Sequence, residues 1–276
     1  GLIFILVSIS LKISAAPFHM WTPDVYQGAP TLVTTLLSTI PKIAAFGVLI
    51  RLLVYPFSEI TIDWGKILII LSITSMLVGS LGALLQSDLK RLMAYSTINH
   101  IGFMLMGLIP GTEDGITAIC IYIIFYVTMN LCIFLFILNM NRDQINVSSI
   151  KDLSGLYKSQ PLMATFIAIL LFSMAGIPPL AGFFGKWYVF LAAVNAGLVP
   201  LAVIGVVMSV VGAFYYLRII KIMYFEDSEA PLDQDVPLAN KLVLGVSMAV
   251  ILLFFAGLNS VIDAANTATM ALMAPF

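Results

Sequence analysis

Long apolar runs separated by short polar connections dominate the pattern of this chain. The runs cover about residues 1–19, 30–54, 67–86, 92–110, 115–140, 160–197, 199–225 and 238–262. Each run approaches or exceeds the roughly 20 residues that an α-helix needs to cross a bilayer. The pattern therefore predicts an all-α, polytopic transmembrane helical bundle with eight candidate spans, built as a single membrane domain over residues 1–276.

Two of the apolar runs contain residues that break helices. The stretch PFHMWTPDVYQGAP at 17–30 holds three prolines, and GIPPLAG at 176–182 divides the run 160–197. Proline removes a backbone donor and clashes with the preceding helical turn. Non-helical backbone at membrane depth is stable only where protein buries it or where it lines a wet cavity. We therefore expect two interrupted helices, each beside a functional interior, as in many transporters.

The composition agrees with a membrane location and argues against several classes of partner. Hydrophobic residues make up 61% of the chain and charged residues 10%, with a mean hydropathy of +1.07. Such values are typical of chains whose solvent is lipid. The formal net charge is only -1, so the chain shows no sign of a nucleic-acid partner or a strongly charged substrate.

Charges in the connections predict the orientation of the bundle. Basic residues occupy alternate connections, whereas Glu113 and Asp114 lie in an intervening one. Basic loops face the cytoplasm, or the matrix in mitochondria. We therefore expect that side to carry the loops with Lys90, Arg91, Arg142, Lys151, Lys158, Arg218, Lys221 and Lys241.

Other features of the chain exclude common chemistry. Cys120 and Cys132 lie twelve residues apart in one apolar run, about 18 Å along a helix axis, which is too far for a disulfide or a shared metal. We expect both cysteines to be small packing residues. Gly1 lies inside an apolar run with no basic segment or cleavage site before it, so we expect a fragment without a signal peptide.

Three lysines, Lys12, Lys42 and Lys186, lie inside apolar runs that hold no acidic residue close to them. A charge near the bilayer centre costs roughly 2.5 to 3.5 kcal/mol on insertion scales. Three such groups need a hydrated interior or a route by which they lose the proton. The lysines therefore indicate a proton path.

Each of the three lysines also has a structural interpretation. Lys12 can snorkel from a helix end, although His19, seven residues later, is expected on the same helical face. Lys42 shares a face with Thr35 and Ser38, and the adjacent Pro41 frees a backbone carbonyl, which favours function.

Lys186 follows the second break and is either an interfacial anchor or the last lysine of a relay. Gly182 and Gly185 lie beside it in sequence. We expect these small neighbours to leave room for water around the ammonium.

His100 lies midway through its apolar run, with Ser96 one turn before it. A lone histidine is more often a hydrogen-bonded core residue than a ligand, but its titration range also suits a bridging proton carrier. Tyr122 and Tyr126 recur at helical spacing in the next run and either order water or pack between helices. Lys90 lies ten residues before His100 and is a candidate for proton uptake from the aqueous side.

Four stretches together resemble the antiporter-like membrane subunits of respiratory complex I. They are LKISAAPFHMWTPDVYQGAPT, PKIAAFGVLIRLL, SDLKRLMAYSTINHIGFMLMG and FSMAGIPPLAGFFGKWYVF. The resemblance covers nearly the whole chain. It implies helices seven to fourteen of a fourteen-helix fold in which helices seven and twelve are interrupted.

The resemblance also implies roles for the candidate residues. Lys12, Lys42 and Lys186 correspond to lysines of the family's hydrated central axis, and His19 and His100 to positions that bridge them. The family pairs its helix-seven lysine with a glutamate on helix five, which this chain lacks, in agreement with a fragment.

The implied function is proton translocation coupled to electron transfer between NADH and quinone. This chain is then a non-redox subunit that binds no cofactor and has no independent catalysis, while partner subunits carry NADH, FMN, iron–sulfur clusters and quinone. Its implied partners are other membrane subunits, lipids and the transported protons. Its implied location is a bacterial inner (plasma) membrane or a mitochondrial inner membrane.

Two alternatives remain open on the sequence. A large subunit of an Mrp-type multisubunit cation/proton antiporter shares this fold and many of these motifs, and sodium-dependent exchange would distinguish it. A structural scaffold with inert polar residues is the other alternative, which loss of all three lysines would test. A free-standing enzyme is disfavoured, because the sequence shows no phosphate-binding glycine loop, metal-ligand cluster or nucleophile constellation.

Overall fold

Helices make up nearly all of the secondary structure in the computed structural model, which describes residues 1–227, 231–233 and 236–274. The predicted all-α class is confirmed. In chain order the helices are α1 (Leu2–Ile13), α2 (Trp21–Gly28), α3 (Thr31–Val54), α4 (Thr61–Leu84), α5 (Leu89–Leu108), α6 (Glu113–Leu138), α7 (Leu156–Ser159), α8 (Pro161–Ala175), α9 (Ala181–Asn195), α10 (Val199–Phe225), α11 (Leu238–Leu253) and α12 (Leu258–Met273).

Short elements join some of these helices. Turns of 3-10 helix cover Ser58–Ile60, Ile150–Leu153 and Phe254–Gly257. Strands β1 (Asn141–Arg142) and β2 (Ile145–Asn146) form a small antiparallel hairpin after α6.

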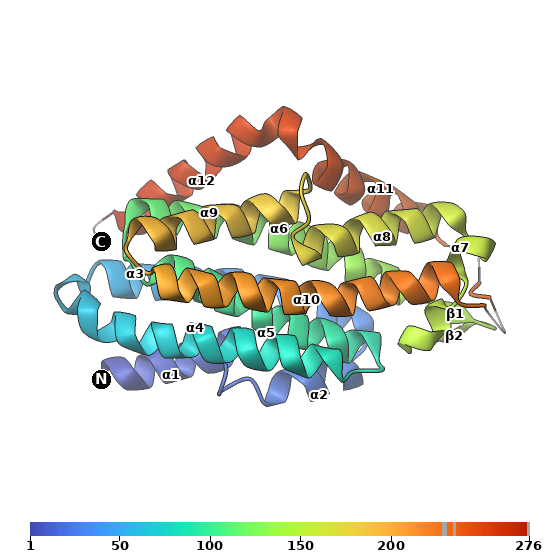
Figure 1. Cartoon of the computed structure of the whole chain (residues 1–276), viewed down its shortest axis with the longest axis horizontal. Helices are drawn as coiled ribbons and strands as arrows, with labels where there is room; N and C mark the ends of the chain where they lie inside the picture. Colours follow the sequence, from blue (N-terminus) through green and yellow to red (C-terminus); the bar gives the residue numbers. More distant parts are fainter. Residues whose placement is uncertain (228–230, 234–235, 275–276) are drawn as a thin grey trace.

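The helices run along a common long axis, with α10 lying between α4 and the α8–α9 pair in the view of Figure 1. Helix α5 is the centre of the bundle, because it packs against α2, α4, α6, α9 and α10. All but two of its residues are buried. Helices α11 and α12 meet at an angle and cover α6 on the opposite side from α1 and α2 (Figure 1).

Five helical segments of the described chain are long and apolar enough to cross a membrane. They are Thr31–Val54, Ser58–Leu84, Glu113–Leu138, Val199–Phe225 and Leu238–Met273. Helices α1 and α8 are apolar but shorter. Helix α5 is 20 residues long and carries several polar side chains within an almost fully buried helix. The membrane class is thus confirmed, while the total of eight spans stays a prediction.

Several predicted boundaries were wrong. The first helix ends at Ile13 rather than near residue 19, because the backbone turns into a left-handed conformation at Ser14 (φ 69°). Helix α4 begins at Thr61, six residues before the predicted run, since Asp63 and Lys66 occupy its exposed first turns and lower the hydropathy there.

The predicted end of the last span, 238–262, was also wrong. Helix α11 stops at Leu253, a 3-10 turn follows, and α12 continues to Met273. The apolar pattern fades because α12 is amphipathic: Asn266 and Thr269 face α6, where Thr117 shares hydrogen bonds with both.

The two predicted break regions coincide with gaps between helices. Residues 14–20 separate α1 from α2, and residues 176–180 separate α8 from α9. Both gaps contain a cis peptide bond before proline, at Ala16–Pro17 and Pro178–Pro179. Gly176 has φ 87°, a conformation that favours glycine, and it ends α8. That each helix pair forms one interrupted span stays a prediction.

Helices α4 and α5 approach closely through small residues. A Cβ atom added to Gly79 would lie 2.4 Å from the backbone nitrogen of Asn99, closer than non-bonded atoms can approach. Small residues at such contacts let membrane helices pack backbone to backbone. Asn99 and His100 are thereby held in the middle of the bundle.

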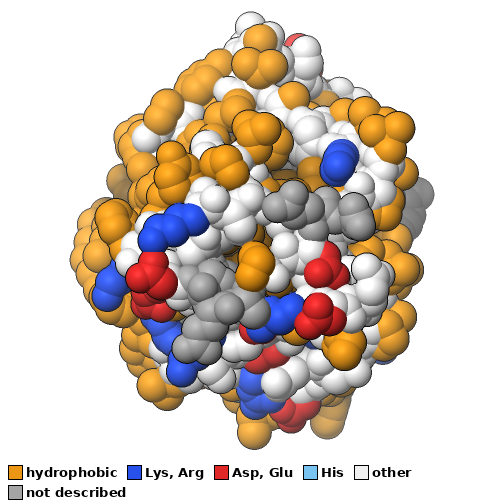
Figure 2. Space-filling view, turned by 90° about the vertical axis from the view of Figure 1, so that its right-hand side faces the viewer, with side chains coloured by type: hydrophobic (Ala, Val, Ile, Leu, Met, Phe, Trp, Pro, Cys, Tyr) orange, Lys and Arg blue, Asp and Glu red, His pale blue; other side chains and the backbone are white. Residues whose placement is uncertain are grey.

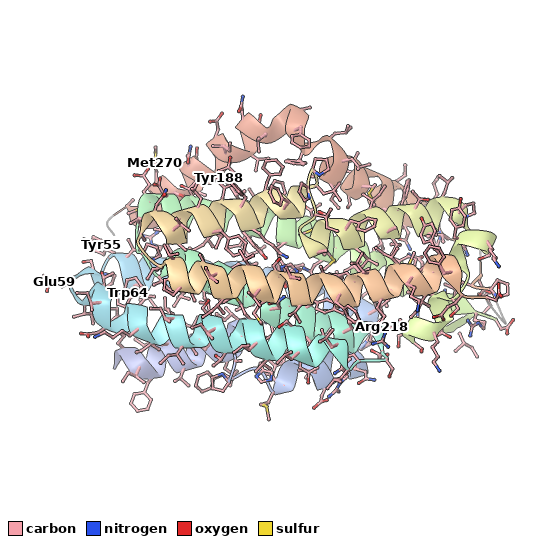
Figure 3. All side chains as sticks on the ribbon, in the orientation of Figure 1. Tyr55, Glu59, Trp64, Tyr188, Arg218 and Met270 are labelled. Carbon is pink, nitrogen blue, oxygen red and sulfur yellow. The ribbon has the colours of Figure 1, made fainter. Side chains whose placement is uncertain are left out.

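Charged side chains gather at the ends of the bundle. Figure 2 shows lysine, arginine, aspartate and glutamate side chains on the face that carries the hairpin end of the molecule. Figure 3 places Arg218 toward this end, and Tyr55, Glu59 and Trp64 at the other. The flanks are apolar and exposed, as at Phe214, which is 63% exposed on α10. Such flanks are typical of lipid-facing helices.

The predicted packing role of the cysteines agrees with the structure. Cys120 and Cys132 are both free and buried within α6. The sulfur of Cys120 accepts a weak hydrogen bond from Thr269 on α12.

Candidate functional site

Lys42 is buried on α3, with only 2% of its surface exposed. Its ammonium donates hydrogen bonds to the backbone carbonyl of Lys12, at 3.0 Å, and to the hydroxyl of Ser14. It also lies 5.1 Å from the centre of the Trp21 ring, a favourable position for a cation. Because α1 ends at Ile13, the carbonyl of Lys12 and the hydroxyl of Ser14 are free to receive this ammonium.

Lys42 has no ion-pair partner in the part of the chain that the structure describes. The four ion pairs found there join other residues, all of them near helix ends or in loops. Neutral oxygens and an aromatic ring therefore hold this ammonium.

Lys12 does not share a buried polar face with His19 as its sequence spacing predicted. Its side chain is exposed, and only its backbone carbonyl contacts Lys42. His19 does not share a helical face with Lys12, because α1 ends before His19; that prediction was wrong. His19 is half-buried, and its Nδ1 atom has no partner among the described residues. Roles for both residues stay predictions.

The predicted polar face around Lys42 is built differently from the expectation. The hydroxyls of Thr35 and Ser38 turn back to carbonyls of their own helix instead of meeting the ammonium. The carbonyl of Ser38 instead accepts a hydrogen bond of 3.1 Å from Tyr126 on α6. Tyr126 also donates to the hydroxyl of Thr97 on α5, at 3.3 Å. Tyr126 thus links the lysine-bearing helix to the centre of the bundle.

His100 is buried on α5 between two tyrosine hydroxyls. Its Nδ1 shares a hydrogen bond of 2.7 Å with Tyr122 on α6, and its Nε2 one of 3.3 Å with Tyr216 on α10. Tyr216 in turn shares a short hydrogen bond with Ser96. The predicted helical neighbour Ser96 therefore reaches His100 through Tyr216, a residue that the sequence did not single out.

This arrangement suits proton transfer in either direction. A neutral imidazole donates from one nitrogen and accepts at the other, and a hydroxyl does both. In the run Ser96–Tyr216–His100–Tyr122, every bond can reverse when a proton enters at one end and leaves at the other. His100 is therefore hydrogen-bonded at both ring nitrogens, and its role as a bridging proton carrier stays a prediction.

Lys186 is buried on α9, with 5% of its surface exposed. Its ammonium donates to the carbonyl of Ala175 at 2.8 Å and to the hydroxyl of Ser209 on α10 at 2.9 Å. It lies 5.1 Å from the centre of the Phe103 ring. The site repeats that of Lys42: a carbonyl at the end of a preceding helix, one hydroxyl and one aromatic face.

The glycines near Lys186 act differently from the expectation. Gly182 and Gly185 were predicted to leave room for water, and at Gly182 this prediction was wrong. A Cβ at Gly182 would meet the carbonyl oxygen of Ser173 at 1.9 Å, and one at Gly185 would meet Tyr122 at 3.4 Å. Gly176 is the glycine that accommodates the lysine, since its Cβ would lie 2.9 Å from the Cδ of Lys186.

Lys90 and Arg91 hold α2 against the start of α5. The ammonium of Lys90 donates a hydrogen bond of 2.7 Å to the carbonyl of Ala29. Arg91 pairs with Asp24 and also donates to Gln27, at 3.1 Å. The cytoplasmic-side location predicted for Arg91 stays a prediction. Proton uptake at Lys90 stays a prediction.

The described residues hold no group of three or more histidine, cysteine, aspartate or glutamate side chains suited to a metal ion. Among the described residues, the buried polar side chains include lysines, the imidazole of His100, several hydroxyls and the amides of Asn99 and Asn130.

Comparison with known families assigns most of the chain. Residues 1–212 match the transmembrane family described as NADH:quinone oxidoreductase/Mrp antiporter. The match includes Lys12, Lys42 and Lys186 and about half of α10.

Curated relatives agree closely in sequence. The chain is 50% identical over 273 residues to NADH-quinone oxidoreductase subunit N of Parvibaculum lavamentivorans, which covers 99% of this chain and 56% of that protein. It is 49% identical over 272 residues to the protein of the same name from Rhodospirillum rubrum, again covering 99% and 56%. The chain thus spans about half the length of the curated relatives it matches.

Solved structures share the fold. A chain of respiratory complex I from Thermus thermophilus superimposes with a TM-score of 0.76 and 34% identity, covering 89% of this chain and 55% of that one. A chain of the Mrp complex from Dietzia sp. gives a TM-score of 0.85 at 22% identity, covering 97% and 58%. The second likeness is one of fold alone.

Proposed function

Since the chain belongs to the NADH:quinone oxidoreductase/Mrp antiporter family of transmembrane proteins, we propose that it is a proton-translocating membrane subunit of an NADH:quinone oxidoreductase. The observation that carries this proposal is a matched pair of buried lysines, Lys42 and Lys186. Each ammonium is held by a carbonyl, a hydroxyl and an aromatic ring, and neither has an ion-pair partner in the described residues.

The relay that we propose runs from Lys42 through the centre of the bundle to Lys186. Tyr126 connects the Lys42 helix to α5, where His100 lies between Tyr122 and Tyr216. The ring centres of His100 and Tyr126 are 5.7 Å apart. Water is expected to complete the steps that direct hydrogen bonds do not cover, as is usual for polar groups buried in transporters.

Electrostatics supplies the coupling in this proposal. Electron transfer takes place in partner subunits, and the charge change there displaces a charged group near Lys12 or Lys42. At an effective dielectric constant near 20, moving an opposite charge from about 4 Å to about 8 Å changes the interaction by roughly 2 kcal/mol, more than a tenfold change in proton affinity. A small motion is therefore sufficient to load or unload a lysine.

The cofactors and partners in this proposal lie outside the chain. NADH, FMN, iron–sulfur clusters and quinone belong to the partner subunits, and this chain contacts other membrane subunits and lipid. In this assembly the chain crosses the inner membrane several times and contributes no redox step of its own.

The test is the substitution Lys42→Ala in the assembled, reconstituted complex. We expect proton translocation to fall while NADH oxidation continues in the presence of an uncoupler. Lys42→Arg keeps a charged side chain that does not release its proton, so we expect proton translocation to fall in this variant as well. Lys241→Ala, at the exposed start of α11, is the matched control and should leave translocation normal. Normal translocation in Lys42→Ala would remove this residue from the path.

The second candidate is a cation/proton antiporter subunit, which the TM-score of 0.85 with the Mrp chain favours on fold alone. Its prediction is sodium-dependent proton exchange in vesicles without NADH oxidation. The sequence identities of 50% and 49% with the two subunit N proteins favour the first candidate.

A further inference from the structure

Two buried polar groups near His100 have no hydrogen-bond partner among the described residues: the side-chain oxygen of Asn99 and the hydroxyl of Tyr215. Asn99 lies on α5 and is 2% exposed, and Tyr215 lies on α10 and is fully buried. Leaving a buried polar group unpaired is costly, so such groups normally meet water or a ligand. Both are therefore candidates for the same unassigned polar site.

Gly212 shows that the two groups lie beside one another. A Cβ added to Gly212 would lie 3.3 Å from the side-chain nitrogen of Asn99 and 3.6 Å from the hydroxyl of Tyr215. The absence of a side chain at this position thus leaves space against both polar groups. Tyr215 also lies near Tyr216, Asn99 and Ser96, although its hydroxyl meets none of the three in hydrogen-bond geometry.

This polar site adjoins the histidine bridge. Ser96 shares a hydrogen bond with Tyr216, and Tyr216 shares one with Nε2 of His100. A water molecule that bridges Tyr215 and Asn99 would therefore lie next to Ser96. Ser96 is the end of the hydrogen-bonded run Ser96–Tyr216–His100–Tyr122 that is farthest from Tyr122. The site is separate from the Lys42 contacts, which lie among α1, α2 and α3.

Two further polar residues of α10 flank this site along the chain, one on either side. Ser209, which binds Lys186, lies three residues before Gly212. Arg218 lies three residues after Tyr215 and donates to the carbonyl of Leu84 at the end of α4. Figure 3 shows Arg218 toward the end of the bundle where the basic loops gather. At 1.5 Å per residue, Tyr215 is only about 5 Å inward from Arg218.

We propose that Asn99, Tyr215 and Gly212 form a hydrated site between α4, α5 and α10 that supplies protons to His100 from the basic-loop end of the bundle, with Ser96 and Tyr216 as the connecting hydroxyls. The ligand of the site is water. This route is distinct from uptake at Lys90, whose ammonium is occupied by the carbonyl of Ala29 at the end of α2. The proposal rests on the proton-relay function proposed above, but the presence of water at the site does not.

Accessibility of a thiol tests the water directly. In the complex with Cys120 and Cys132 replaced by alanine, Tyr215→Cys is treated with a charged, membrane-impermeant methanethiosulfonate reagent added to either side. We expect reaction from the side of the basic loops, roughly tenfold faster than for Val210→Cys on the lipid-facing side of the same helix, because only a hydrated thiol ionises. Lys221→Cys, exposed near the end of α10, is the positive control.

Failure to label Tyr215→Cys from the basic-loop side, while Lys221→Cys reacts, overturns the site whatever the pumping activity. Labelling from that side supports it. This measurement uses no proton transport, so its outcome is independent of whether the proposed function holds.

A second variant tests the functional connection without creating a cavity. Gly212→Ala places a methyl group 3.3 Å from the side-chain nitrogen of Asn99, a tight contact, and 3.6 Å from the hydroxyl of Tyr215, an ordinary one, where it displaces water. We expect proton transfer to slow roughly fivefold, the factor that corresponds to one lost hydrogen bond. Gly245→Ala on α11, where a Cβ meets open space, should be normal. If Lys42→Ala impairs translocation but Gly212→Ala does not, the relay stands and this supply route is wrong.

Discussion

The ammonium of Lys42 donates a hydrogen bond to the backbone carbonyl of Lys12, thirty residues earlier in the chain. The contact exists because α1 ends at Ile13 and leaves its last carbonyls without helical partners. Lys186 uses the carbonyl of Ala175 at the end of α8 in the same way. Each buried lysine is thus seated on the open end of a helix, whose partial negative charge favours a cation.

Ser14→Ala should weaken the Lys42 site without removing the lysine. The variant deletes a hydroxyl that accepts from Lys42 and from Thr22. Loss of one such hydrogen bond corresponds to about a fivefold change in a rate or equilibrium constant. We therefore expect proton translocation to slow by about this factor. The measurement is proton uptake in vesicles during NADH oxidation. Ser10→Ala, buried one turn earlier in α1, is the control. Equal rates in both variants would show that the hydroxyl does not tune Lys42.

Tyr122→Phe should interrupt the bridge at His100. The hydroxyl shares a 2.7 Å hydrogen bond with Nδ1, and without it that nitrogen is buried and unpaired. We expect a fall in translocation of at least tenfold, with the electron-transfer rate under uncoupling preserved, since a proton carrier is removed from a series path. Tyr224→Phe changes only a hydroxyl near the end of α10 that donates to Thr165. The account is contradicted if the two variants behave alike.

Gly176→Ala should disturb Lys186 by crowding. The new methyl group would lie 2.9 Å from Cδ and 3.1 Å from Nζ of the lysine. Gly197→Ala is the control: it introduces alanine at a similarly positive φ of 78° but into open space. Its loss of stability therefore measures the cost of the backbone conformation alone. Overpacking costs about 1–3 kcal/mol. We therefore expect Gly176→Ala to melt at a lower temperature than Gly197→Ala and to translocate protons less well. Identical melting temperatures would indicate that α8 shifts to make room.

The two cations at the start of α5 should differ in their contribution to stability. Arg91 pairs with Asp24, which is 74% exposed, so Asp24→Asn should lower the free energy of unfolding by less than about 1 kcal/mol. Lys90→Met removes the hydrogen-bond donor to the partly buried carbonyl of Ala29, just after α2, and should cost about 1–3 kcal/mol. Thermal unfolding of the detergent-solubilised complex measures both. A larger effect for Asp24→Asn would show that the ion pair with Arg91, rather than the hydrogen bond from Lys90, is the main contact that holds α2 against α5.

Lys42, Lys186 and His100 could be picked out from sequence as buried titratable groups, because such a group inside a long apolar run is costly and rare, whereas Lys12 is exposed. The break regions were equally visible, since proline and glycine interrupt the apolar pattern near Pro17 and Gly176. The family resemblance added the order of the helices. These features depend on local composition, which one sequence reports directly.

The partners of these groups could not be predicted in the same way. Ser14, Ser209 and Tyr216 are common residue types on apolar helices, and nothing in their spacing marks them. Each meets its lysine or histidine only through the register of one helix against another. The face shared by Lys12 and His19 failed for a related reason, because the left-handed turn at Ser14 ends the helix.

The most direct test of the central claim compares Lys42→Ala, Lys186→Ala and the double variant in the reconstituted complex. The quantity is the number of protons translocated per NADH oxidised. If the two lysines act in series, each single variant loses the share carried by this subunit, and the double variant loses no more than either one. A ratio equal to that of the unmodified complex in all three variants would contradict the account.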